Sequence, residues 1–68
     1  MTRYVAATCT VLGHPRRAIN DRLENAHWWC SDKTTDAAIT RILDGLNTGT
    51  IRRNHLTWHD SRCDKELA

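Results

Sequence analysis

The sequence predicts a small α+β domain in which a strand, two helices and a second strand follow one another. Three patterns predict this order: apolar residues alternate over 2–12, and they recur at spacings of three and four over 15–30 and again over about 35–47. A period of two is typical of a strand, and spacings of three and four are typical of a helix. We expect both helices to pack on one face of a small antiparallel sheet, since two strands alone bury too little apolar surface to be stable.

The first strand is predicted over residues 2–12, TRYVAATCTVL. Successive side chains of a strand point to opposite faces. One face of this strand is therefore apolar and carries Val5, Ala7, Cys9 and Val11. β-Branched residues, which favour strands, are frequent in the segment, and Gly13 ends it.

The first helix is predicted over residues 15–30. Pro15 suits the first helical position, where no backbone donor is needed. An apolar stripe follows at spacings of four, three and four: Ile19, Leu23, Ala26 and Cys30. Such a stripe is typical of a helix that buries one side.

The second helix is predicted over about 35–47. Ser31, Asp32, Thr34 and Thr35 can each cap its start through the side-chain oxygen, and Gly49 can take the left-handed conformation that ends it. Its core stripe consists of Ala38 or Ile39 with Ile42, Leu43 and Leu46. Gly45 lies inside this helix and weakens it by about 1 kcal/mol relative to Ala.

Residues 50–59, TIRRNHLTWH, fit a strand or a helix. Thr50, Ile51, Thr57 and Trp58 favour the strand. A helix over 50–63 gives the alternative fold, an all-α domain of three helices. The polar tail from about residue 61 is expected to be frayed or weakly helical. Residues 1–68 contain no linker and are expected to form one domain.

The composition disfavours catalysis. The chain has 68 residues and a net charge of +2, and it lacks a Gly-rich phosphate loop, a GxSxG motif and paired carboxylates in an apolar setting. We therefore expect a non-enzymatic binding protein without a cofactor. Cysteine is odd in number and has no CxxC pair, which favours a reducing compartment and a cytoplasmic location. A Cys30–Cys63 bridge stays open.

Aromatic residues provide the first binding hypothesis. Trp28 and Trp29 are adjacent and point about 100° apart on a helix, so at least one of them reaches the surface. With Trp58 and Tyr4 they predict a protein interface, because Trp and Tyr often dominate binding energy. The expected partner is a larger protein or nucleoprotein complex, with the chain acting as an inhibitor or adaptor of the kind that phages and plasmids direct against host machinery. An exposed sheet edge also allows a homodimer.

Arginine pairs provide the second hypothesis. Arg16 and Arg17 stand at the predicted start of the first helix, where the helix dipole favours acids, so an external anion would resolve the conflict. Together with Arg52 and Arg53 they predict a small nucleic-acid-binding regulator. The low net charge argues against it.

A metal site is the third hypothesis. His55, His59 and Cys63 are spaced four and four apart, which places them on one side of either a helix or a strand. Zinc takes four nitrogen or sulfur ligands, so the chain is alternatively a zinc-stabilised mini-domain. The absence of tight Cys pairs argues against this hypothesis.

Overall fold

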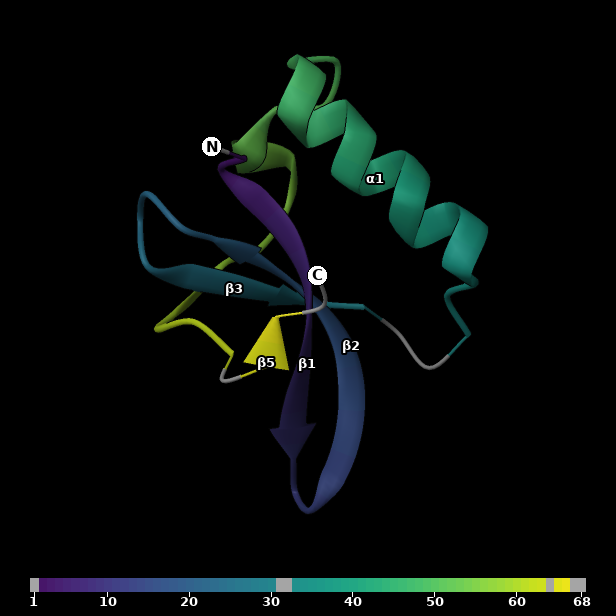
Figure 1. The fold of residues 1–68 in the computed structure, drawn as a ribbon, viewed down its shortest axis with the longest axis vertical. Helices are drawn as coiled ribbons and strands as arrows, with labels where there is room; N and C mark the ends of the chain where they lie inside the picture. Colours follow the sequence, from purple (N-terminus) through teal and green to yellow (C-terminus); the bar gives the residue numbers. More distant parts are fainter. Residues whose placement is uncertain (1, 31–32, 64, 67–68) are drawn as a thin grey trace.

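The computed structural model describes residues 2–30, 33–63 and 65–66. It contains a five-stranded antiparallel sheet with one α-helix across one face (Figure 1). The elements are β1 (Tyr4–Val11), β2 (His14–Asp21), β3 (Ala26–Trp29), α1 (Asp36–Thr48), the 3₁₀-helix η1 (Arg53–His55), β4 (His59–Asp60) and β5 (Lys65–Glu66). The strands lie in the order β4-β3-β2-β1-β5. The predicted strand–helix–helix–strand order is therefore wrong, as is the all-α alternative.

The strand predicted over 2–12 is confirmed as β1. It forms a long hairpin with β2, in register from Tyr4 opposite Asp21 to Val11 opposite His14 (Figure 1). Leu12 and Gly13 form the turn, both with positive φ, 52° and 81°. Two positive φ angles are what a two-residue type I′ turn needs, because its twist matches that of the strands.

The helix predicted over 15–30 is wrong, because this segment forms β2, a turn and β3. Its stripe included Leu23, which is 71% exposed at the turn. The Asp21 carboxylate accepts hydrogen bonds from the backbone N–H groups of Leu23 and Glu24, and Asn25 has a φ of 53°. These turn-forming contacts compete with the helix and explain the error.

The helix predicted over about 35–47 is confirmed as α1. The hydroxyl of Thr35 accepts from the N–H of Ala38 at 3.2 Å, and Gly49 ends the helix with a φ of 87°. Gly45 has a packing role, because a Cβ added there would lie 2.5 Å from Cδ1 of Ile51. Among the described residues, no helix is both long enough and apolar enough to cross a lipid bilayer.

The strand predicted over 50–59 is also wrong in most of its length. In the structure, this segment contains η1 and the first residue of β4, His59. Leu56 and Trp58 instead pack against the core between α1 and the sheet, because their larger apolar surface is buried better there than on a two-sided strand. The polar tail predicted from about 61 to be frayed or weakly helical is corrected too, since Cys63 is buried and Lys65–Glu66 pairs with β1. Residues 31, 32, 64, 67 and 68 lie outside the described residues.

Two hydrophobic clusters lie on opposite faces of the sheet. Tyr4 and Ile19 pack with Leu46 of α1 on one face. Ala7 and Ala18, which are paired across β1 and β2, pack with Cys63 on the other. Since β4 and β5 lie at opposite edges of the sheet, the segment 61–63 between them passes over this second face, and we call it the crossing segment.

A buried ion cluster closes the helix side of the sheet. Asp21 is fully buried and accepts hydrogen bonds from Arg3 at 2.9 Å and Arg53 at 2.7 Å. Burial raises the pKa of Asp21, but the hydrogen bonds from the two guanidinium groups and the backbone outweigh it and lower the pKa to about 2. Arg53 also lies over the ring of Trp58. The charge is thus buried as part of a hydrogen-bonded network.

Candidate metal centre

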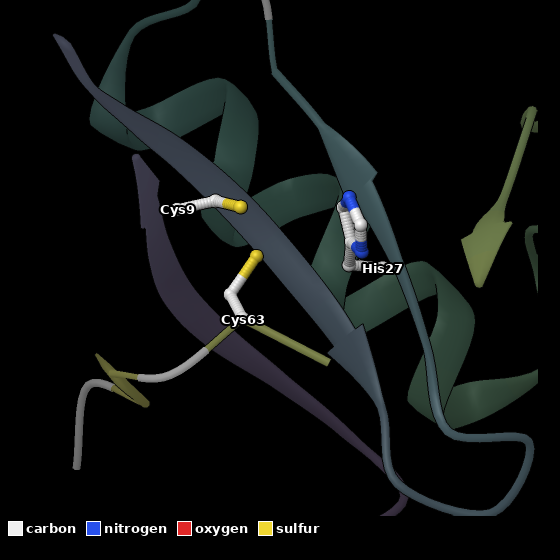
Figure 2. Close-up of side chains that lie close together, drawn as sticks. All are labelled: Cys9, His27 and Cys63. Carbon is white, nitrogen blue, oxygen red and sulfur yellow. The ribbon is translucent and has the colours of Figure 1, made fainter. Parts of the chain in front are cut away.

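Three ligating side chains meet on the sheet face opposite α1. Cys9 comes from β1, His27 from β3 and Cys63 from the crossing segment, and their ligand atoms all lie within 4.8 Å of one another (Figure 2). In a tetrahedral zinc site with Zn–S bonds of about 2.3 Å, two sulfur atoms lie about 3.8 Å apart. The 4.8 Å limit exceeds this distance by about 1 Å, so the three side chains would move closer together to hold one ion.

Two alanines make room for the crossing segment on the sheet. Ala7 and Ala18 are each 1% exposed, and Cys63 packs on them. A larger side chain at either position would hold Cys63 away from the sheet, since protein interiors have little spare volume. The small residues thus allow a cysteine of the C-terminal region to reach the level of Cys9.

Asn20 fixes the backbone of Cys63. The amide of Asn20 is fully buried and makes a reciprocal pair of hydrogen bonds: its Nδ2 donates to the carbonyl of Cys63 at 3.1 Å, and its Oδ1 accepts from the N–H of Cys63 at 2.9 Å. The same Nδ2 also donates to Glu66 at 3.3 Å. The position of the Cys63 backbone is therefore set by the sheet and does not depend on the thiol.

His27 has the hydrogen-bonding pattern of a metal ligand. Its Nδ1 lies 2.7 Å from the carbonyl oxygen of Ser61, which can only accept, so Nδ1 carries the proton. Nε2 then has a bare lone pair, and it is buried with no hydrogen-bond partner among the described residues. A buried unpaired polar atom costs about 1–3 kcal/mol. Metal-bound histidines commonly donate their second ring nitrogen to a carbonyl in this way.

Two further rings flank the centre. His59 lies opposite His27 across β3 and β4, with 5.4 Å between ring centroids and 29° between planes. The ring of Trp29 lies 4.8 Å from that of His59 at 24°. Lone pairs of imidazole nitrogens lie in the ring plane, so nearly parallel rings do not direct them at one point. His59 therefore packs against His27 in this arrangement and does not share its ligand position.

Only one of the three residues predicted as metal ligands belongs to this cluster. Cys63 belongs to the cluster, whereas His55 lies exposed in η1 and His59 is exposed in β4. Cys9 and His27 were missed, because Cys9 has no close donor in the sequence and the donor nearest to His27, Cys30 three residues on, lies outside the cluster. The available signal was the place of Cys9 on the apolar face of the first strand.

Cys30 lies outside the cluster. It is 2% exposed, and burial raises the pKa of its thiol. All three cysteines are thiols, so the open Cys30–Cys63 bridge is absent from the structure. Cys30 is therefore a natural control for the two clustered cysteines.

The residues predicted for protein binding lie on both sheet faces. Tyr4 is buried, and Trp28 and Trp58 are half-buried around the core beneath α1. Trp29 is half-buried on the opposite face, beside Ala7 and Ala18 in the second cluster. The four rings therefore do not form one exposed patch.

The two arginine pairs lie at different ends of the sheet. Arg16 and Arg17 are near the hairpin turn, where Arg17 pairs with Asp36 at the start of α1. Arg52 is exposed just before η1, and Arg53 is bound to Asp21 at the far end of β2. The structure does not bring the four guanidinium groups into one patch.

The fold and the cluster define a small β-sheet domain with one covering helix and a candidate centre of two cysteines and one histidine. Comparisons with protein-family models, with curated proteins and with solved structures find no match. The functional argument therefore depends on the geometry of this chain.

Proposed function

We propose that the chain is a zinc-binding mini-domain in which Cys9, His27 and Cys63 hold the ion. The observation that carries this proposal is the buried Nε2 of His27, which has no hydrogen-bond partner among the described residues and belongs to a ring grouped with two thiols, their ligand atoms within 4.8 Å of one another. A zinc ion would bind this nitrogen and both sulfurs at once.

The donor set favours zinc over harder ions. Thiolate and imidazole are the ligands that zinc prefers, whereas magnesium and calcium prefer oxygen. Two thiolates also neutralise the charge of a divalent ion, so the centre is neutral with three ligands bound. A neutral centre is compatible with its partly buried position, because burial of net charge is costly.

Zinc would supply stability that a chain of this size lacks. A domain of 68 residues buries little apolar surface relative to the conformational entropy lost on folding. The ion would join two strands to the crossing segment, and Cys9 and Cys63 stand near opposite ends of the chain. A reducing cytoplasm would keep both thiols available for the ion.

Binding of a larger protein, as an inhibitor or adaptor, stays a prediction for this scaffold. Leu12 and Leu23, which are 94% and 71% exposed, lie at turns at opposite ends of β2 and are two separate candidate contact points for such a partner. Co-purification before and after nuclease treatment separates protein from nucleic-acid partners. Light scattering at high concentration tests the predicted homodimer.

Zinc stoichiometry and affinity test the proposal. We expect one zinc per chain by elemental analysis. We expect Cys9→Ser, Cys63→Ser and His27→Gln each to weaken zinc binding at least tenfold in competition with a chromophoric chelator, while Cys30→Ser binds as the wild type does. A wild-type protein without zinc, or a Cys30→Ser variant as impaired as Cys9→Ser, would refute the proposal.

A further inference from the structure

We propose that the zinc centre has an open fourth coordination position that takes a carboxylate entering beside Arg62 and Lys65. This inference rests on the proposed function, because it requires the ion. It adds a ligand class and a binding site to what is otherwise a stabilising metal.

The cluster supplies three of the four ligands that zinc needs. Within residues 2–30, 33–63 and 65–66, the grouped donors are those of Cys9, His27 and Cys63. His59, the nearest further imidazole in the stacked rings, is held nearly parallel to His27 and does not converge on the same point. Zinc sites with three protein ligands keep the fourth position for water or an external ligand.

A cavity opens on the side of the cluster formed by Cys9 and Cys63, and His27 is not in its wall. It has a volume of about 390 Å³, and Cys9 and Cys63 both contribute to its wall. Ligand pockets for small molecules usually measure about 300–1,000 Å³. The cavity therefore gives an external ligand access to the ion between β1 and the crossing segment.

The charges around this cavity select an anion. Arg62 and Lys65 line it, and no carboxylate is among the described residues that line it. A neutral centre of zinc and two thiolates does not compensate these two positive charges, and Arg62 also interacts electrostatically with Glu66, which lies outside the cavity wall. A carboxylate fits the arrangement, because one oxygen can coordinate zinc while the other pairs with the guanidinium of Arg62.

Cobalt substitution tests the open position. Cobalt(II) is placed in the site, where thiolate-to-cobalt charge-transfer absorption reports the two cysteines and the d–d bands report the fourth ligand. The protein is titrated with acetate at constant ionic strength, with perchlorate as the balancing anion. A second titration uses a blocked Gly-Glu-Gly peptide, which separates a small-molecule carboxylate from an acidic side chain of a protein.

We expect both acetate and the peptide to shift the d–d bands saturably. The probe with the lower Kd shows whether the natural ligand is a small-molecule carboxylate or an acidic side chain of a protein. The double variant Arg62→Gln, Lys65→Gln should raise the Kd at least about tenfold, since two charges near a partly buried ion are removed. The matched control, Lys33→Gln with Arg41→Gln, removes the same charge from residues outside the cavity wall and should keep the wild-type Kd.

The outcomes separate the two proposals. Without charge-transfer absorption, the zinc site itself fails. With that absorption but d–d bands indifferent to both carboxylates, the open position is refuted. An equal rise in Kd for the control pair would refute the role of Arg62 and Lys65.

Discussion

Zinc should raise the midpoint of thermal unfolding steeply, because the three ligands lie together only in the folded chain. A ligand that binds the folded state alone stabilises it by RT ln(1 + [Zn]/Kd), which is about 2.7 kcal/mol when free zinc is a hundred times the Kd. Each further tenfold rise in free zinc adds about 1.4 kcal/mol.

The size of the chain converts these energies into temperature. At about 2.1 cal/mol/K per residue, the entropy of unfolding for 68 residues is about 0.14 kcal/mol/K. We therefore expect the midpoint to rise by about 19 °C at a hundredfold excess over the Kd, and then by about 10 °C for each tenfold rise in free zinc. Zinc binding by the unfolded chain reduces the stabilisation, so these rises in midpoint are upper limits.

The assay is a series of circular-dichroism melts in reducing buffer, with free zinc set by a metal buffer. The wild type and Cys30→Ser should give the same rise of midpoint with log free zinc, and in Cys9→Ser the rise should begin only at a free zinc concentration at least tenfold higher. A wild-type midpoint independent of free zinc refutes the reasoning. So does a Cys30→Ser variant that loses the slope, because Cys30 lies outside the cluster.

Three further predictions concern the fold. The folded-state pKa of Asp21 is about 2 against an ordinary 3.8, so its contribution of about 2 kcal/mol to the free energy of unfolding is complete above pH 4 and is lost as the pH falls toward 2. Urea unfolding between pH 5 and 2 measures this loss. An Asp21→Asn variant with the same pH profile as the wild type would contradict it. Gly45→Ala should destabilise the domain, because a Cβ only 2.6 Å from Cγ1 of Ile51 costs about 1–3 kcal/mol and outweighs a gain of about 1 kcal/mol in helix propensity. The loss of stability should be smaller in an Ile51→Ala background. If the stability effects of the two substitutions are additive, the contact is not the cause. Leu12→Asn should raise the free energy of unfolding in urea by up to about 1 kcal/mol, because Asn tolerates the φ of 52° better than Leu does. A lower urea midpoint than that of the wild type would contradict this prediction.

The sequence predicted those elements whose signals are complete within the element. β1 shows alternation over its whole length, and α1 has a cap, an apolar stripe and a terminating glycine. The segment 15–30 failed because its periodic apolar stripe coincides with a hairpin. Its deciding residues are Asn20 and Asp21, whose burial is compensated by Cys63, Arg3 and Arg53 far along the chain.

The candidate site was less predictable than the fold. Local spacing singled out Cys63 together with His55 and His59, because short-range patterns are what one sequence displays. The ligands that join Cys63 come from β1 and β3, and the sheet register and the crossing segment bring them together. A site assembled from three distant segments has no spacing signature.

The most direct measurement is X-ray absorption at the zinc edge of the purified, reduced protein. The account predicts two sulfur neighbours at about 2.3 Å and nitrogen or oxygen neighbours at about 2.0–2.1 Å, unchanged in Cys30→Ser and reduced to one sulfur in Cys9→Ser. A shell of nitrogen and oxygen alone, or a third sulfur that disappears in Cys30→Ser, would contradict it.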